Sequence, residues 1–120
     1  MPNINAIIQA TAEHFEITVA DIIGPSRRAV FAKPRQLAMH ISKKITQAST
    51  PKIGAKFGGR HHTTVCEAQA KVRSEMNDEM LIDISKIIQR AESIFTEEVR
   101  EAKEYLTSYA NDNLLKSIQF

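Results

Sequence analysis

The chain has 120 residues and 42% of them are hydrophobic, enough for one compact domain with a core of its own and a possible appendage. A single cysteine, Cys66, excludes an intramolecular disulfide framework and suits a reducing compartment. Without a basic-then-apolar leader or an apolar run long enough to span a bilayer, we expect a cytoplasmic protein that has no membrane contact.

The net charge of +2 conceals a segregated charge distribution. Residues 1–25 carry three acids and no Lys or Arg, whereas residues 26–73 carry eleven Lys or Arg and one acid, Glu67. Residues 74–120 carry five bases and ten acids. A basic block of this kind favours a surface that meets a polyanion, although an incidental solvated face is the alternative.

Apolar residues recur at helical spacing and no stretch alternates with period two, so we predict an all-α fold. The first helix has Asn3 or Asn5 as its N-cap. The apolar residues that mark it are Ile4, Ile7, Ile8, Ala12 and Phe15.

A short second helix follows, because Thr18 and Asp21 have the spacing of a capping box and Gly24-Pro25 ends it. Residues 25–33, "PSRRAVFAK", are predicted to be a basic connector, because Pro34 is acceptable only in the first turn of the next helix. That third helix is marked by Leu37, Ala38, Ile41, Ile45 and Ala48.

The stretch from Thr50 to Val72 predicts a helix-turn-helix. Thr50 and Pro51 are expected as N-cap and first residue of a short helix, and Gly58-Gly59 ends it. Val65, Ala68 and Val72 mark the next helix, which in this motif is the one presented to DNA. The leading turn of that helix offers short polar side chains to base edges, namely those of His61, His62, Thr63 and Thr64.

Rival interpretations of "FGGRHHTTV" are weaker. Gly54 and Gly59 are spaced as in a phosphate-binding loop, but Arg60 and His61 replace its lysine and hydroxyl, so we expect no nucleotide. His62 and Cys66 lie one turn apart, yet a structural zinc needs four ligands, so we expect no metal or other cofactor. The paired histidines lack a nucleophile or carboxylate pair, which predicts that the protein is not an enzyme. A purely structural alternative is that the histidines and threonines only cap the helix.

The C-terminal segment predicts a long amphipathic helix or helical hairpin. Asn77-Asp78 are expected to end the preceding helix and cap the new one, which divides the chain into a domain of residues 1–76 and a tail of residues 77–120. The tail has a stripe of mostly apolar residues at coiled-coil spacing, its seam. This seam leaves two alternatives open, packing on its own domain or a homodimer through residues 78–120. The seam consists of Leu81, Ile84, Ile88, Ala91, Phe95, Glu98, Ala102, Tyr105 and Tyr109.

The motifs "VADIIG", "AKPRQLAMHISKKIT" and "IGAKFGGRHHTTVCEA" resemble the C-terminal DNA-binding domain of the bacterial replication initiator DnaA. That family has GGRDHTTV after ARPRQ, and the resemblance covers roughly residues 5–75. It implies a helical bundle with a helix-turn-helix, and double-stranded DNA as the partner. Nothing after about residue 76 matches, and no Walker motif is present, so we expect no ATPase activity.

The resemblance also implies roles for individual residues. Arg27 falls at the minor-groove position, with Arg28 as the alternative if the register slips by one. His62, Thr63 and Thr64 fall on the family's base-contacting HTT, and His61 stands beside them. The expected phosphate contacts, from the resemblance and from free amides at a helix start, are Arg28, Lys33, Arg35, Lys43, Thr50, Lys52 and Arg60.

His61 departs from the family, which has aspartate there. Aspartate accepts a hydrogen bond from cytosine N4, whereas histidine donates, or accepts through one nitrogen only. We therefore expect a site that overlaps a DnaA box but differs or is relaxed at that base pair. The predicted function is regulation of transcription or replication initiation; the alternatives are an adaptor that uses the acidic tail, or a tail that covers the basic face.

Overall fold

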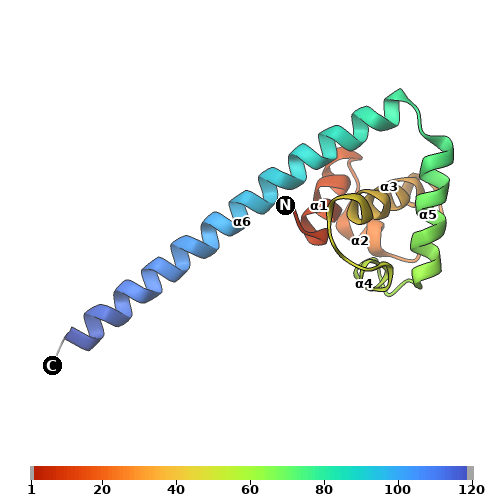
Figure 1. Ribbon diagram of the computed structural model, residues 1–120. Helices are drawn as coiled ribbons and strands as arrows, with labels where there is room; N and C mark the ends of the chain where they lie inside the picture. Colours follow the sequence, from red (N-terminus) through yellow and green to blue (C-terminus); the bar gives the residue numbers. More distant parts are fainter. Residues whose placement is uncertain (1, 119–120) are drawn as a thin grey trace.

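The computed structural model describes residues 2–118, with side chains described for residues 2–111. Within this range the fold has six helices and no strand, which confirms the all-α prediction. The helices are α1 (Ile4–His14), α2 (Val19–Ile23), α3 (Ala29–Ile45), α4 (Thr50–Lys56), α5 (His62–Glu75) and α6 (Asp78–Ile118). α1 to α5 form a bundle, and α6 runs along it and far beyond it, so the molecule measures 66 × 28 × 24 Å (Figure 1).

The first two helices begin as the sequence predicts. The side chain of Asn3 accepts a hydrogen bond of 2.8 Å from the amide of Ala6 and caps α1. Thr18 and Asp21 form a complete capping box at α2, with both hydrogen bonds at 3.0 Å. Gly24 then ends α2, so the basic segment begins at the expected place.

α3 begins earlier than predicted. The helix starts at Ala29, so residues 29–33 are helical and only residues 25–28 form a connector. Pro34 lies inside α3, where it has no N–H to donate to the carbonyl of Val30. Val30 is the second residue of α3 and is 54% exposed, so the missing hydrogen bond falls at the exposed start of the helix, which makes the proline tolerable there.

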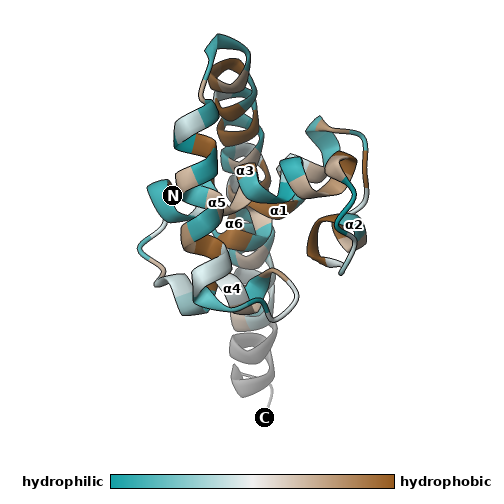
Figure 2. Cartoon of the chain, turned by 90° about the vertical axis from the view of Figure 1, so that its right-hand side faces the viewer, coloured by the Kyte–Doolittle hydropathy of each residue, from teal (hydrophilic) through white to brown (hydrophobic). Residues whose placement is uncertain are grey.

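α4 and α5 form the predicted helix-turn-helix. The N-cap of α4 is Ser49, one residue before the expected Thr50, and its side chain accepts from the amide of Lys52. Figure 2 shows that hydrophobic residues concentrate on particular sides of the helices. The side chains that fill the centre of the bundle are Ile7, Ile22, Met39, Ile41, Ile53, Phe57 and Val65.

The first half of α6 belongs to the same core. Asn77 caps this helix through a hydrogen bond of 2.8 Å from the amide of Met80 to its side chain. Ile87, Ala91 and Ile94 are buried, and α6 packs chiefly against α1. Polar contacts flank this packing: Arg90 Nε lies 2.7 Å from Glu13 Oε2, and His14 Nε2 lies 2.7 Å from Asp83 Oδ1.

The second half of α6 leaves the bundle. Side chains from residue 100 to residue 111 are exposed, including the large apolar ones of Tyr105, Leu106 and Tyr109. Self-packing, one of the two alternatives for this helix, is therefore correct for the seam from Ile84 to Phe95 only, because Leu81 is 52% exposed. Residues 76–77 separate α5 from α6, and residues 87–94 of α6 share the core of α1 to α5. The division into two domains stays a prediction.

Candidate nucleic-acid interface

The turn between α4 and α5 depends on its two glycines. Gly58 and Gly59 have φ of +76° and +74°, a conformation that residues with a Cβ rarely adopt. A Cβ on Gly58 would also overlap the carbonyl oxygen of Ile23, whereas a Cβ on Gly59 would meet open space. Gly58 is thus where this turn touches the end of α2.

Arg60 fastens the same turn to α2. Its Nη1 donates to the carbonyls of Phe57 at 2.6 Å and Ile23 at 3.1 Å, and its Nη2 donates to the carbonyl of Gly24. Burial lowers the pKa of Arg60 from its ordinary value. An arginine side chain nevertheless keeps its charge in a protein. The expected phosphate contact of Arg60 is therefore secondary to a structural role, since most of its guanidinium donors are already engaged.

The position of Arg35 contradicts its predicted role. It was expected to contact phosphate, but it is buried in the bundle. Its Nε donates to the carbonyl of Ile22 at 2.5 Å, its Nη1 to that of Ser26 at 2.9 Å and its Nη2 to that of Asp21 at 3.0 Å. Burial, and then the positive charge of Arg60, lower the pKa of Arg35.

These two arginines position the basic loop, residues 24–28. A helix ends with carbonyls that lack partners within the helix, and positive charge is favourable there. Arg35 and Arg60 satisfy the carbonyls at the end of α2 and so fix the path of the loop. Arg27 and Arg28 follow directly and are exposed, and the Arg28 guanidinium lies 5.9 Å from the ring centre of Phe31.

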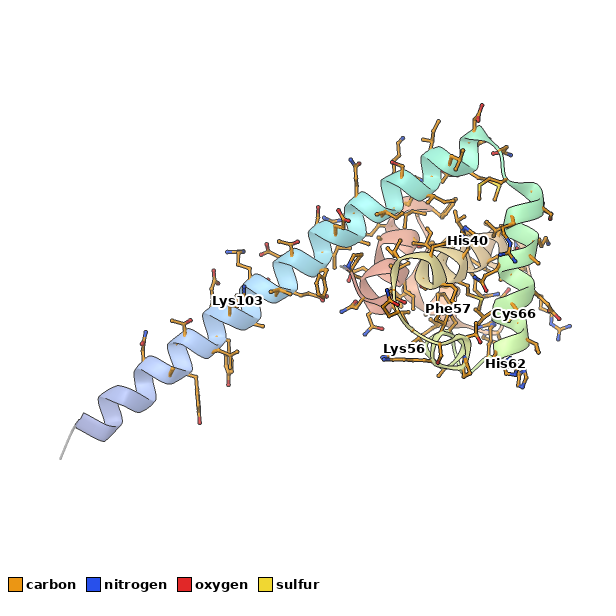
Figure 3. The ribbon with its side chains drawn as sticks, in the orientation of Figure 1. His40, Lys56, Phe57, His62, Cys66 and Lys103 are labelled. Carbon is orange, nitrogen blue, oxygen red and sulfur yellow. The ribbon has the colours of Figure 1, made fainter. Side chains whose placement is uncertain are left out.

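The tip of α5 is exposed and ordered by its own cap. His61 is the N-cap residue, and its Nδ1 accepts from the amide of Thr63 at 3.2 Å and lies 2.9 Å from the Thr63 hydroxyl. The neutral ring with an accepting Nδ1 carries its proton on Nε2, so this tip presents a donor to its surroundings. The His61 and His62 rings lie 4.2 Å apart, and His62 stands at the end of α5 farthest from α6 (Figure 3).

A basic groove separates the α5 tip from the basic loop. Its walls come from the basic loop, the first turns of α3 and the face of α5 that carries Thr64. Glu67 is the one acidic side chain of the groove. The charged or polar side chains that line it are Arg27, Lys33, Arg35, Gln36, Arg60, Thr64, Glu67 and Lys71.

The remaining predicted phosphate contacts lie at the rim or away from the groove. Lys33 is exposed and lines the groove, and Lys52 is exposed in the first turn of α4. Thr50 is half-buried at the start of α4. Lys43 turns toward its own loop, where its Nζ donates to the carbonyl of Ala48 at 3.3 Å.

Two groove residues were missed by the sequence analysis. Lys71 lies seven residues after Thr64, which is close to two helical turns, so it continues the same face of α5. Gln36 lies three residues after Lys33 on α3 and also lines the groove. Both could have been identified from the sequence, because each lies at helical spacing from a predicted site residue, Thr64 or Lys33.

The described residues offer no competing metal or membrane site. Among them, no group of three or more His, Cys, Asp or Glu side chains is placed to hold a metal ion. His14 and His40 lie on α1 and α3, whereas His62 and Cys66 lie on α5. No described helix combines the length and apolar character that crossing a bilayer requires.

The fold and this surface define a helix-turn-helix protein, in which the second helix of the motif, α5, exposes its tip beside a basic groove. Comparison with known families makes this specific: the family model described as the bacterial dnaA protein helix-turn-helix matches residues 4–72. The chain belongs to this DnaA helix-turn-helix family.

Curated relatives agree with the family assignment. The chain is 41% identical over 88 residues to the chromosomal replication initiator protein DnaA of Cereibacter sphaeroides, which is 72% of this chain and 19% of that protein. It is 42% identical over 86 residues to the DnaA protein of Cutibacterium acnes, covering 70% of this chain and 17% of that protein. The chain thus spans less than a fifth of the length of these relatives.

Proposed function

We propose that the protein binds double-stranded DNA in a sequence-specific manner at sites that resemble DnaA boxes. The observation that carries the proposal is a single surface that combines the exposed tip of α5 with a basic groove and the exposed Arg27. A recognition helix contacts base edges in the major groove through its first residues. His61, His62, Thr63 and Thr64 supply the donors, acceptors and methyl groups for such contacts.

The basic groove fits the phosphate backbone between two DNA grooves. With the tip of α5 in the major groove, a sugar-phosphate strand passes over the groove toward Arg27, which then reaches the adjacent minor groove. Lys33 and Lys71 contact that strand from opposite walls, while Arg28, Thr50 and Lys52 contact phosphates at the rim. Such contacts hold the register, and the α5 tip discriminates among sequences.

We assign to the protein a regulatory role at these sites, in transcription or in the initiation of replication, within the cytoplasm at the nucleoid. The relatives that carry this domain are named for chromosomal replication initiation. The expectation that the chain acts without ATPase activity stays a prediction, and measurement of ATP hydrolysis with and without DNA tests it.

Titration against duplex DNA tests the proposal. A short duplex with one DnaA box and a scrambled duplex of equal length are compared at several salt concentrations. We expect tighter binding to the box and a steep loss of affinity with salt, with a logarithmic slope of about −0.9 for each neutralised phosphate. Equal affinity for both duplexes rejects sequence specificity, and a flat salt dependence rejects the phosphate-binding groove.

An adaptor that docks on a partner protein through α6 is the second candidate function. The exposed Tyr105, Leu106 and Tyr109 favour it, because large apolar side chains clustered on a surface mark interaction sites. If the protein is such an adaptor, its affinity for DNA should depend little on salt concentration. Charge reversal at Lys33 should then leave its function unchanged. The third alternative, a tail that covers the basic face, has no support in residues 96–118, which run away from the bundle (Figure 1).

A further inference from the structure

The free half of α6 repeats the apolar face with which the first half packs on α1. Ile87, Ile88 and Ala91 contribute to the core, and Tyr105, Leu106 and Tyr109 follow each of them by 18 residues. Eighteen residues are five turns of an α-helix. The three exposed residues therefore point in the same direction as the three packed ones, but nothing in the described chain covers them.

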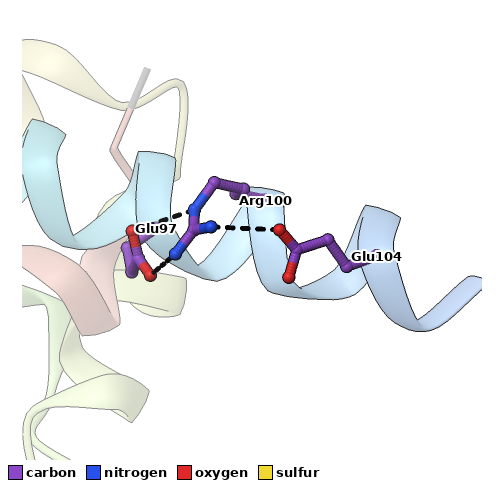
Figure 4. A network of polar contacts seen from close by, with 3 residues as sticks. All are labelled: Glu97, Arg100 and Glu104. Atoms are coloured by element: carbon purple, nitrogen blue, oxygen red, sulfur yellow. Dashed lines mark hydrogen bonds and ion pairs between the residues drawn. The ribbon is translucent and has the colours of Figure 1, made fainter.

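The opposite side of this half is a solvated surface. Arg100 Nη1 lies 3.0 Å from Glu104 Oε1, and the same guanidinium contacts Glu97 (Figure 4). Arg100 precedes Tyr109 by nine residues, or two and a half turns, so it lies on the far side of the helix from Tyr109. One face of the segment thus carries an ion-paired arginine, and the other carries Tyr105, Leu106 and Tyr109 without a partner, with Glu98 as the acid of that face. A helix with an exposed apolar cluster of this kind requires its burial.

We propose that a second copy of this chain covers the apolar face, through antiparallel pairing of residues 96–118. This inference deepens the proposed function: a dimer could bind two DNA sites only if each copy binds DNA as proposed above. The compactness of the cluster selects the occupant: Tyr105, Leu106 and Tyr109 lie within about one turn of the helix, around residue 107, so the same three side chains can meet their counterparts in a second copy. A two-fold axis there brings the cluster of one copy onto the cluster of the other, as an isologous interface requires.

Steric considerations select the antiparallel orientation. The apolar face of the free half continues the face that α1 occupies. A parallel copy of α6 on this face would therefore enter the volume of α1 near Phe95. In an antiparallel copy the bundle lies toward the opposite end of the pair, so its α1 is kept apart from the α1 of the first copy.

The charges of the segment favour the same orientation. Residues 97–104 carry four glutamates against Arg100 and Lys103, and residues 105–111 carry no charge. Parallel pairing would set the two acidic stretches side by side. Antiparallel pairing places each beside residues 110–117, where the sequence has one acid, Asp112, and one base, Lys116.

Sedimentation or light scattering over about 1 to 100 µM protein, in the range of affinities that short interfaces reach, tests the pairing. We expect the mass to rise from that of one 13.5 kDa chain toward that of two. Leu106→Glu should raise the dissociation constant at least about tenfold, because it places a charge at the centre of the interface. Thr107→Glu, the matched control one residue away, should dimerise like the unaltered chain, and circular dichroism should show equal helix content in all three.

Three outcomes of this experiment overturn the proposal: a mass of one chain at every concentration, unchanged dimerisation by Leu106→Glu, or an equal loss with Thr107→Glu. Orientation is measured with spin labels on single cysteines in a Cys66→Ser background. Labels at Glu97→Cys should be about 30 Å apart along the pair, whereas labels at Ser108→Cys should be close together. Close labels at both positions overturn the antiparallel arrangement.

Binding to a one-box duplex separates this inference from the proposed function. Leu106→Glu should bind that duplex as tightly as the unaltered chain, because residue 106 is remote from α5 and the basic loop. A monomeric chain that still prefers the box contradicts the pairing alone. A dimer without preference for the box contradicts the proposed DNA-binding function alone.

Discussion

At the scale of single residues, the basic side chains near the groove are of two kinds. Some stabilise the fold through hydrogen bonds, and others are exposed and can bind phosphate. Arg35 and Arg60 lie next to exposed basic residues in the sequence, yet their donors meet carbonyls of residues 21–24, 26 and 57. Residue type alone does not reveal this difference. A signal was nevertheless available, because a short helix that ends at Gly24-Pro25 leaves carbonyls that need donors.

Arg35→Ala should therefore lower stability rather than only weaken a phosphate contact. Loss of three hydrogen bonds from a buried charged group to carbonyls is expected to reduce the free energy of unfolding by about 3 kcal/mol. Urea denaturation measures the change, and Arg28→Ala is the matched control, with an expected change of less than about 0.5 kcal/mol. Equal stability of the two variants would refute the structural role of Arg35.

His61 is the residue that we expect to set the preferred base. Its Nδ1 is engaged by Thr63, so its Nε2 is left to donate, whereas the family's aspartate accepts. His61→Asp should restore preference for the family's box, with a change of about 1–3 kcal/mol in discrimination at one base pair. Selection from random DNA with both proteins measures this, and recovery of identical optimal sites would show that His61 acts only as a cap.

At the scale of helices, hydrophobic spacing and cap residues predicted α1, α2, α5 and the glycine turn. The start of α3 was misplaced because the proline rule was applied to Pro34 without knowledge that Val30 faces solvent. The length of the self-packed part of α6 was not predictable either, since the same apolar spacing continues through both halves. Only the finite length of α1 determines where packing ends.

The glycine turn offers a test within the helix-turn-helix. Gly59→Ala should cost about 1 kcal/mol, because its φ is positive but its surroundings are open. Gly58→Ala should cost at least about 2 kcal/mol more, because its Cβ also overlaps the carbonyl of Ile23. Thermal or urea denaturation compares them, and equal losses would show that the turn does not press against α2.

The packing of α3 against α5 predicts a dependence of stability on pH. His40 is buried and its Nδ1 has no hydrogen-bond partner among the residues that the structure describes. Burial, followed by the charges of Lys44 and Arg73, lowers the pKa of His40 below the ordinary 6.5. The unfolded chain therefore binds a proton at higher pH than the folded chain. The contribution of neutral His40 to stability is complete above pH 6.5 and is lost as pH falls from there to the lowered pKa.

His40→Gln should remove this part of the pH dependence. Urea denaturation at about pH 7.5 and 5.5, on either side of the ordinary histidine pKa, should show a larger loss of stability in the unaltered chain than in the variant. The other three histidines are common to both proteins and cancel in the comparison. The Glu13–Arg90 pair lowers the pKa of Glu13 further below 4.5, so this carboxylate does not titrate in the same window. Parallel losses would contradict the assignment to His40.

At the scale of the whole molecule, the structure separates two surfaces by the length of α6. The α5 tip and the basic groove lie at one end, and the free apolar face of residues 96–111 lies at the other (Figure 1). Charge segregation along the sequence predicted a basic surface, and in the structure the basic block and the acidic second half of α6 occupy different parts of the fold. The sequence left open whether the tail is one helix or a helical hairpin. The separation of the two surfaces depends on α6 being one continuous helix.

Amide chemical shifts, recorded while a one-box duplex is added to isotopically labelled protein, test the central claim most directly. We predict that the largest changes fall on residues 61–67 and on residues 26–36, the two sides of the basic groove, while residues 96–111 change little. Largest changes on α6, with the first turn of α5 unaffected, would contradict the proposal that this helix-turn-helix grips DNA.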